Sequence, residues 1–174
     1  MGVIGMILGN LRNMKKAKKL RAMPRAELLA MDDEDFYDAM ACITEDAVYD
    51  LGEQKDLPRE LIVVYTLIKL EMEVNNGGLC QFFVNSSREC APYVSEALEA
   101  VGALGIKDLF EGFVKGNGID VRDLSSFKLS RIEEFEEQTK RFDFDTFDDR
   151  FYEDHALHQQ IIAYARKHVE QIVK

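Results

Sequence analysis

Residues 57–87 read LPRELIVVYTLIKLEMEVNNGGLCQFFVNSS, and this stretch decides the fold class. As far as Val74 it is apolar on nearly every side of a helix, which predicts a central and mostly buried helix. Pro58 suits the first turn of that helix. Asn75-Asn76-Gly77-Gly78 then supplies residues that tolerate positive φ, as the end of a helix often requires. We therefore predict a long helix, a corner, and a short second helix that packs back onto the core.

The corner carries most of the polar side chains of this stretch. We expect Asn85, Ser86 and Ser87 to cap helix ends through hydrogen bonds from side chain to backbone. Glu71 and Glu73 are two residues apart on the preceding turn, so they point in different directions and do not form an acid/base pair. The corner is thus interpreted as a structural motif formed by Asn75, Asn76, Gly77, Gly78, Gln81, Phe82, Phe83, Asn85 and Ser86.

Apolar residues recur at helical spacing on both sides of this stretch. Further helices are predicted at about 24–31, between the cap Asp32 and Gly52, from the cap Asp56, and at about 92–101, 106–115, 125–142 and 154–173. The inward positions are Phe36, Met40, Ile43, Ala47 and Leu51, then Val94, Leu98 and Val101, then Phe127, Ile132, Phe135, Thr139 and Phe142, and finally Leu157, Ile161, Ile162, Ala165 and Val169. These patterns predict an all-α protein: a single compact helical domain of seven to nine helices.

Length and cysteine content place the chain in a broad class. The 174 residues suit one domain, and no apolar run reaches the ~18 residues of a transmembrane helix. Three cysteines form an odd set without a Cys-x-x-Cys pair, which fits a reducing compartment, and each is expected to be a small buried hydrophobe. We predict a cytoplasmic protein.

The net charge of -10 is unevenly distributed. Residues 1–25 contain seven Lys or Arg residues and no acid, so the rest of the chain is strongly acidic. An acidic body repels nucleic acid and anionic lipid and attracts basic partners. We therefore expect no direct binding of nucleic acid by residues 24–174.

A basic N-terminal arm is assigned to residues 1–23. Its apolar stripe is followed by lysines rather than preceded by them, which argues against a secretory signal, and Met6 breaks the myristoylation pattern. One interpretation is an arm that binds a membrane surface or nucleic acid. The other is a terminal helix whose stripe docks on the core or on a second subunit. The arm could also fold back and mask an acidic face. The stripe comprises Ile4, Ile7, Leu8, Leu11 and Met14.

Two acidic segments, 32–60 and 133–154, are candidates for a partner-binding surface. Carboxylates on helix faces directed at water can meet a basic partner, and they can equally serve as helix caps or keep the protein soluble. The candidate residues are Asp35, Asp38, Glu45, Asp46, Glu53, Glu133, Glu134, Glu137, Asp143, Asp145, Asp148 and Asp149, of which the last four are expected in or near a loop.

Patterns for catalysis or metal binding are weak. His155 and His158 are one helical turn apart, but no third ligand accompanies them in a known motif. The segment from Asp143 to Asp154 does not fit a calcium loop, because Asp148 stands where glycine is required. There is no phosphate-binding loop, dinucleotide fingerprint or nucleophile elbow. We expect no catalysis, no metal and no cofactor.

Three segments are recognisable: EVNNGGLCQFFVNSS (73–87), APYVSEALEAVGA (91–103) and FDFDTFDDRFYE (142–153). Together they resemble the DNA mimic protein 19 domain family, whose members are small, acidic, all-helical bacterial proteins. The resemblance covers roughly residues 33–169. It implies a single helical domain, often a homodimer, whose surface carboxylates imitate DNA phosphates and occupy the DNA-binding face of a transcription factor.

Two classes of function follow, with a third in reserve. The first is a non-catalytic acidic interaction protein that binds a basic DNA-binding protein, such as a helix-turn-helix regulator. The second is an enzyme or small-ligand binder whose pocket is lined by Asn75, Asn76, Gln81 and Asn85. The reserve is an antitoxin-like or immunity protein.

Overall fold

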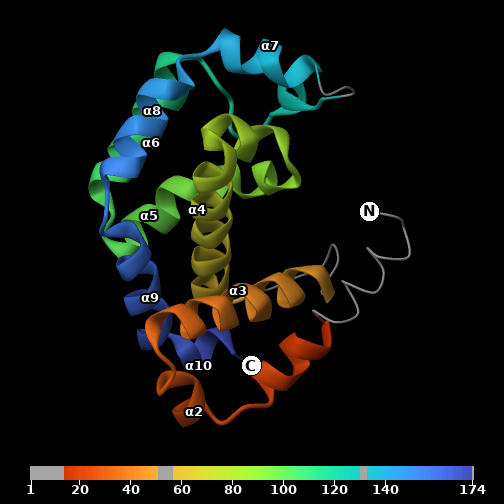
Figure 1. The fold of residues 1–174 in the computed structure, drawn as a ribbon, viewed down its shortest axis with the longest axis vertical. Helices are drawn as coiled ribbons and strands as arrows, with labels where there is room; N and C mark the ends of the chain where they lie inside the picture. Colours follow the sequence, from red (N-terminus) through yellow and green to blue (C-terminus); the bar gives the residue numbers. More distant parts are fainter. Residues whose placement is uncertain (1–13, 51–56, 130–132, 174) are drawn as a thin grey trace. The chain divides into compact units, whose positions relative to one another are not determined.

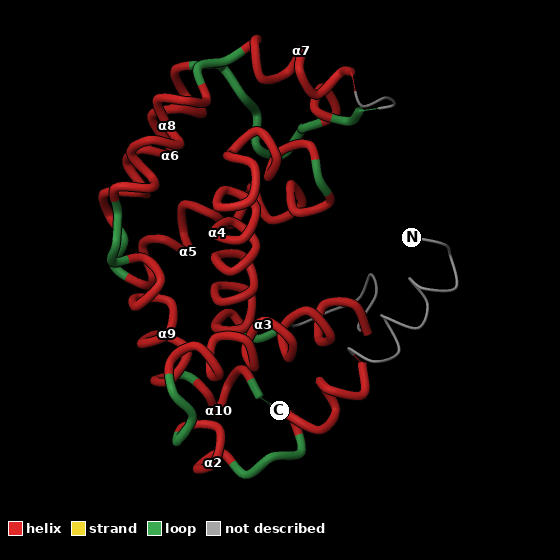
Figure 2. Tube along the Cα trace, in the orientation of Figure 1, coloured by secondary structure: helices red, strands yellow, loops and turns green. Residues whose placement is uncertain are grey.

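The computed structural model describes residues 14–50, 57–129 and 133–173. Figure 1 labels the helices α2 to α10, and Figure 2 shows helices joined by loops, with no strand in these ranges. The all-α prediction is therefore confirmed. The predictions made for residues 1–13 and for Leu51, Gly52, Glu53, Asp56 and Ile132 lie outside the described residues.

The chain divides into two compact units. The first unit comprises Met1–Tyr65 with Ile162–Lys174, and the second comprises Thr66–Ile161. The first holds the helical residues 14–21, α2 (Arg25–Leu29), α3 (Asp33–Asp50) and α10 (Val169–Ile172). The second holds η1 (Ser86–Tyr93), α5 (Val94–Val101), α6 (Leu104–Gly116), η2 (Ser125–Phe127), α7 (Glu133–Arg141) and α8 (Phe144–Glu153). The boundary between the units falls inside α4 (Arg59–Val84) and α9 (Leu157–Lys167).

Helix α3 supplies much of the core of the first unit. Its predicted inward positions Phe36, Met40, Ile43 and Ala47 are all buried. The helix begins as expected, because the backbone N–H of Asp35 donates to Oδ1 of Asp32 at 2.9 Å.

Part of the basic arm packs into the same unit. Ala17 and Leu20 are buried, while the neighbouring lysines at 15, 16, 18 and 19 are exposed. Arg21 donates to the carbonyl oxygen of Ile43 at 3.3 Å and lies 3.4 Å from the carboxylate of Asp46. Residues 14–21 therefore pack into this unit through Ala17 and Leu20, whereas the predicted stripe, apart from the half-buried Met14, lies outside the described residues.

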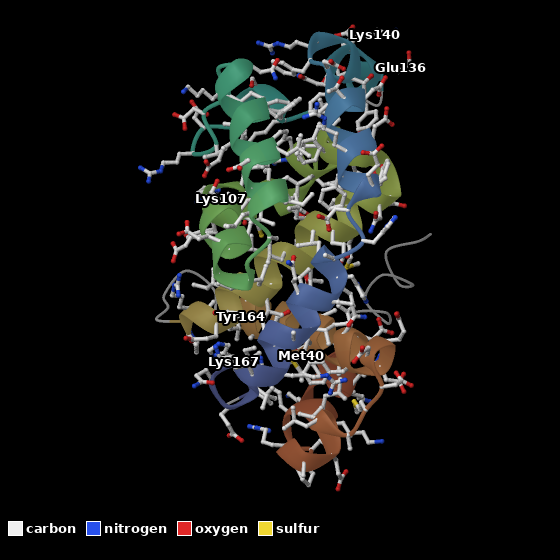
Figure 3. All side chains as sticks on the ribbon, turned by 90° about the vertical axis from the view of Figure 1, so that its left-hand side faces the viewer. Met40, Lys107, Glu136, Lys140, Tyr164 and Lys167 are labelled. Carbon is white, nitrogen blue, oxygen red and sulfur yellow. The ribbon has the colours of Figure 1, made fainter. Side chains whose placement is uncertain are left out.

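Phenylalanine rings hold the second unit together. The ring of Phe83 in α4 lies 5.0 Å from that of Phe127 in η2, 6.3 Å from Phe110 in α6 and 6.4 Å from Phe144 in α8. Four segments distant in sequence therefore meet at one side chain. Figures 1 and 3 both show α6 and α8 running side by side.

The acidic segment around Asp145 differs from its prediction. Asp143, Asp145, Asp148 and Asp149 were expected in or near a loop; Asp143 does precede the helix, but α8 contains the other three. Phe144, Phe147 and Phe151 are buried at helical spacing, and Asp143 caps the helix by accepting from the Thr146 N–H. Burial of this apolar stripe, together with the cap, outweighs the repulsion between the aspartates.

The helix predicted from Ser125 to Phe142 is interrupted. A short η2 precedes the separate helix α7, and Thr139 is exposed rather than inward, with its hydroxyl donating to the carbonyl oxygen of Glu136. At the C-terminus, Leu157, Ile161, Ile162, Ala165 and Val169 are buried as predicted. The helix there begins at Leu157, and Asp154 caps it by accepting from the N–H groups of Ala156 and Leu157.

Candidate functional site

The predicted corner is present inside α4, where two helices meet at a break. Gly77 has φ -166° and ψ 28°, and Gly78 has φ 77° and ψ 177°, so both leave the helical conformation. At Gly78 the positive φ favours glycine. A Cβ added there would also lie 2.1 Å from Oδ2 of Asp148, so both backbone conformation and space require glycine.

Helix α8 lies against this corner and closes it. The backbone N–H of Leu79 donates to Oδ1 of Asp148 at 2.8 Å. One turn further along α8, the hydroxyl of Tyr152 donates to the carbonyl oxygen of Val74 at 2.7 Å. The two polar groups therefore bind backbone atoms that the break in α4 frees from the helical ladder. The segments 73–87 and 142–153, recognised separately in the sequence, form one structure.

Asp148 is not an exposed surface carboxylate. Burial raises the pKa of its carboxyl group, the hydrogen bond from Leu79 opposes this, and the nearby carboxylates of Asp145 and Asp149 raise the pKa further. The sequence interpretation of Asp148 as part of an accessible acidic surface is therefore replaced by a structural role.

Glu73 gathers the polar side chains of the corner. Its carboxylate accepts from Nε2 of Gln81 at 2.7 Å, from Nδ2 of Asn85 at 2.8 Å and from Oγ of Ser87 at 2.5 Å. The expectation that Asn85 and Ser87 act as caps was wrong for their side chains, since η1 begins without a side-chain cap from Asn85. A buried or half-buried carboxylate attracts donors more strongly than a neutral carbonyl does.

The remaining corner residues divide between core and surface. Leu79, Phe82 and Phe83 are buried, as predicted. Asn75, Asn76 and Ser86 are exposed. Glu71 points away from Glu73, with its Oε2 3.2 Å from Nδ1 of His158. The two carboxylates thus face different partners, as their spacing predicts.

The acidic residues proposed for a partner-binding surface differ in their exposure to solvent. Asp46 is 6% exposed and ion-paired with Arg21, so it belongs to the interior of the first unit rather than to a partner-binding surface. Glu134 is half-buried, and Glu53 and the side chain of Glu133 lie outside the described residues. The exposed candidates are Asp35, Asp38 and Glu45 in the first unit and Glu137, Asp143, Asp145 and Asp149 in the second.

Helices α7 and α8 differ in how far their acids are neutralised. In α7, Lys140 lies 3.8 Å from Glu136, and the labelled side chains stand together in Figure 3. In α8, Asp145 and Asp149 follow one another at a spacing of four residues on the exposed side, and Glu153 extends the row. Among the described residues, none of these three carboxylates has an ion-pair partner. We call Asp145, Asp149 and Glu153 the α8 row.

A cleft of about 490 Å³ opens beside this row. It is lined by Gly105, Ile106, Asp108 and Leu109 of α6 and by Arg150, Glu153 and Asp154 at the end of α8. The four corner amides proposed for a ligand pocket are not among its lining residues.

The histidines and cysteines were the other reactive candidates. His155 is exposed and His158 faces Glu71, and the described residues contain no group of three potential metal ligands. Cys80 and Cys90 are buried, as predicted, and Cys42 is half-buried. Burial raises the pKa of the Cys80 thiol to about 12, so it is protonated at neutral pH.

Sequence reasoning missed the roles of Glu73, Asp148 and Tyr152. One signal was available: Glu73, like Glu71, lies in a helix that is apolar on most sides, and a carboxylate in such a place requires hydrogen-bond donors. Nothing in the sequence pattern assigns Asp148 to Leu79, which is 69 residues away.

None of the described helices is both long and apolar enough to cross a membrane. No curated protein and no solved structure matches the chain. A family model described as DMP19-like protein matches residues 55–168, well over half of the chain, and this range contains both the corner and the helix that closes it. The chain belongs to the DMP19-like protein family.

Proposed function

We propose that this protein is a non-catalytic DNA mimic of the cytoplasm that occupies the DNA-binding face of a basic DNA-binding protein, such as a helix-turn-helix regulator. The observation that carries the proposal is the α8 row. Asp145, Asp149 and Glu153 are exposed along one helix, and the described residues provide no ion-pair partner for them. Unneutralised carboxylates at regular spacing are what a DNA-binding surface would meet in place of phosphates.

The spacing of the α8 row determines how many such rows are needed to match the charge density of DNA. Residues four apart on a helix are separated by about 6 Å along its axis. One strand of duplex DNA carries a charge every ~3.4 Å, so the row has roughly half the axial charge density of one strand. We therefore expect the binding species to present more than one such row, as a homodimer would.

The alternative of an enzyme or small-ligand site at the corner was based on four amides, and two of them are less available to a ligand. The amides of Gln81 and Asn85 donate to Glu73, so these groups are engaged within the protein. An antitoxin-like protein would present the same charges, and the identity of the captured partner separates that case from mimicry.

The proposal is tested by capture followed by competition. The tagged full-length protein is incubated with nuclease-treated lysate of the source cells and eluted with stepped salt, and retained proteins are identified by mass spectrometry. We expect a DNA-binding protein that elutes at moderate salt and is displaced by duplex DNA, because screened Coulomb contacts dominate the association.

Charge variants then locate the surface with the purified partner. Asp145→Asn with Asp149→Asn should weaken binding about five- to thirtyfold, if each carboxylate contributes on the order of 0.5–1 kcal/mol. Glu27→Gln with Glu89→Gln is the matched control, because it changes the net charge equally at exposed carboxylates outside the row. Equal binding by both double variants, or retention of proteins that DNA does not displace, would contradict mimicry.

A further inference from the structure

The cleft between α6 and the end of α8 combines two kinds of wall. Ile106 and Leu109 supply apolar surface, and Gly105 leaves the cleft open because it has no side chain. Asp108, Glu153 and Asp154 supply carboxylates at the rim, against the single cation of Arg150. A volume of about 490 Å³ is ample for one long side chain.

The three carboxylates at the rim of the cleft differ in their hydrogen bonding within the protein. Oδ1 of Asp154 accepts from the N–H groups of Ala156 and Leu157, both at 2.9 Å, which fixes the orientation of this group. Asp108 and Glu153 are exposed, and in the described ranges neither forms a hydrogen bond or an ion pair. The rim therefore offers acceptors that the protein itself does not use.

The geometry points to this cleft as the docking site for an arginine side chain of the protein partner. An arginine lays its methylene stem on apolar surface while its guanidinium reaches the polar rim. The planar guanidinium also binds carboxylates in a bidentate manner, which an ammonium group cannot do. Glu153 belongs to both the cleft and the α8 row, so an arginine docked here lies at the end of the carboxylates that face the partner.

This inference rests on the proposed function and deepens it, since it names the group of the partner that is bound and the place where it binds. Arginine is a principal phosphate contact of DNA-binding proteins. A mimic that meets such a surface gains a specific contact from a cleft, in addition to the general attraction of its charge.

Two glycines of α6 allow a test that does not disturb the fold. A Cβ added at Gly105 or at Gly112 meets no atom within 4 Å, and only Gly105 lines the cleft. Gly105→Leu should fill the cleft, whereas Gly112→Leu places the same side chain on the same helix outside it. Leucine has the higher helix propensity, so both variants should melt at or above the temperature of the unsubstituted protein.

The probe is an acetylated, amidated tetra-arginine peptide, titrated into the isotopically labelled full-length protein and followed by NMR. We expect shifts of the amide signals around Gly105 and Leu109, and a tetra-lysine peptide should bind more weakly. Gly105→Leu should raise the Kd about fivefold or more, Gly112→Leu should leave it unchanged, and Arg150→Gln should lower it about threefold by removing the competing cation.

The outcomes separate this inference from the proposed function. If Gly105→Leu and Gly112→Leu bind the peptide equally, the cleft is not the arginine site, and the inference is overturned while mimicry by the α8 row stands. If Gly105→Leu alone converts a dimer to a monomer in sedimentation, the cleft holds a second copy, and the inference is again overturned. If the cleft binds tetra-arginine but the chain captures no DNA-displaced partner, the cleft is still an arginine site, and the proposed function is overturned together with the DNA-binding identity of the partner.

Discussion

The carboxylate of Asp148 accepts a hydrogen bond from the backbone N–H of Leu79 at 2.8 Å, across 69 residues of sequence. This contact joins α8, which carries the proposed interaction surface, to the break in α4. The same carboxylate lies where a Cβ of residue 78 would have to be. Asp148 therefore has two roles: it holds the corner against α8, and it leaves no room for a side chain at position 78.

Replacement of Asp148 should destabilise the second unit. Asp148→Ala leaves the Leu79 N–H without its acceptor in a half-buried place, which costs about 1–3 kcal/mol of unfolding free energy. Asp148→Asn retains an acceptor oxygen and should cost less. Urea denaturation followed by circular dichroism measures both, and equal stability of Asp148→Ala and the parent chain would contradict the assigned role.

The pH dependence of stability should also identify Asp148. Its folded-state pKa is raised above the ordinary value, chiefly by burial, so folding favours the protonated carboxyl group. The contribution of this group to stability is therefore complete below the unfolded-state pKa and is lost as pH rises through the folded-state pKa. Relative to Asp148→Asn, the parent chain should lose stability as pH rises from the ordinary aspartate range toward neutrality. Parallel stability curves for the two proteins would refute this.

Gly78 should be the least replaceable glycine of α4. Gly78→Ala combines a positive φ with a contact of 2.1 Å to Asp148, and we expect a loss of about 2 kcal/mol or more. Gly112→Ala, a helical glycine with open space, should instead gain about 0.5–1 kcal/mol. In a double-mutant cycle, Asp148→Ala should relieve part of the cost of Gly78→Ala, and strict additivity would show that the two residues do not interact.

Glu73 should matter more than any exposed amide of the corner. Glu73→Ala removes the common acceptor of Gln81, Asn85 and Ser87, and we expect a loss of about 2–3 kcal/mol, since hydrogen bonds to charged groups are the stronger ones. Asn76→Ala is the control within the corner, with an expected change within about 0.5 kcal/mol. Chemical denaturation gives both values, and a smaller effect at Glu73 than at Asn76 would contradict the network.

Arg21 should stabilise the first unit rather than mask an acidic face. Arg21→Ala leaves the carboxylate of Asp46, which is 5% exposed, without its ion-pair partner, so we expect a loss of about 1–3 kcal/mol. Lys18→Ala, at an exposed position of the same segment, should change stability by less than about 0.5 kcal/mol. Tighter binding of the DNA-displaced partner by Arg21→Ala, without loss of stability, would instead favour the masking interpretation.

The sequence alone determined the helical class, the buried faces and the corner. These depend on local physics: the period of apolar residues, the cap at Asp32, and a run of asparagine and glycine that tolerates the required backbone angles. The prediction failed at α8, where adjacent aspartates were read as a loop although Phe144, Phe147 and Phe151 had helical spacing.

Only the tertiary structure decided which acids are available to a partner. Asp46 and Asp148 resemble their exposed neighbours in sequence, yet one pairs with Arg21 and the other binds Leu79. Two further features could not be predicted from the sequence. One is the set of hydrogen bonds that Glu73 accepts from Gln81, Asn85 and Ser87, and the other is the cleft between α6 and α8. The physical reason is that the state of a carboxylate depends on burial and on donors brought close by chain folding, and the hydrophobic period that sets the helices carries no information about those partners.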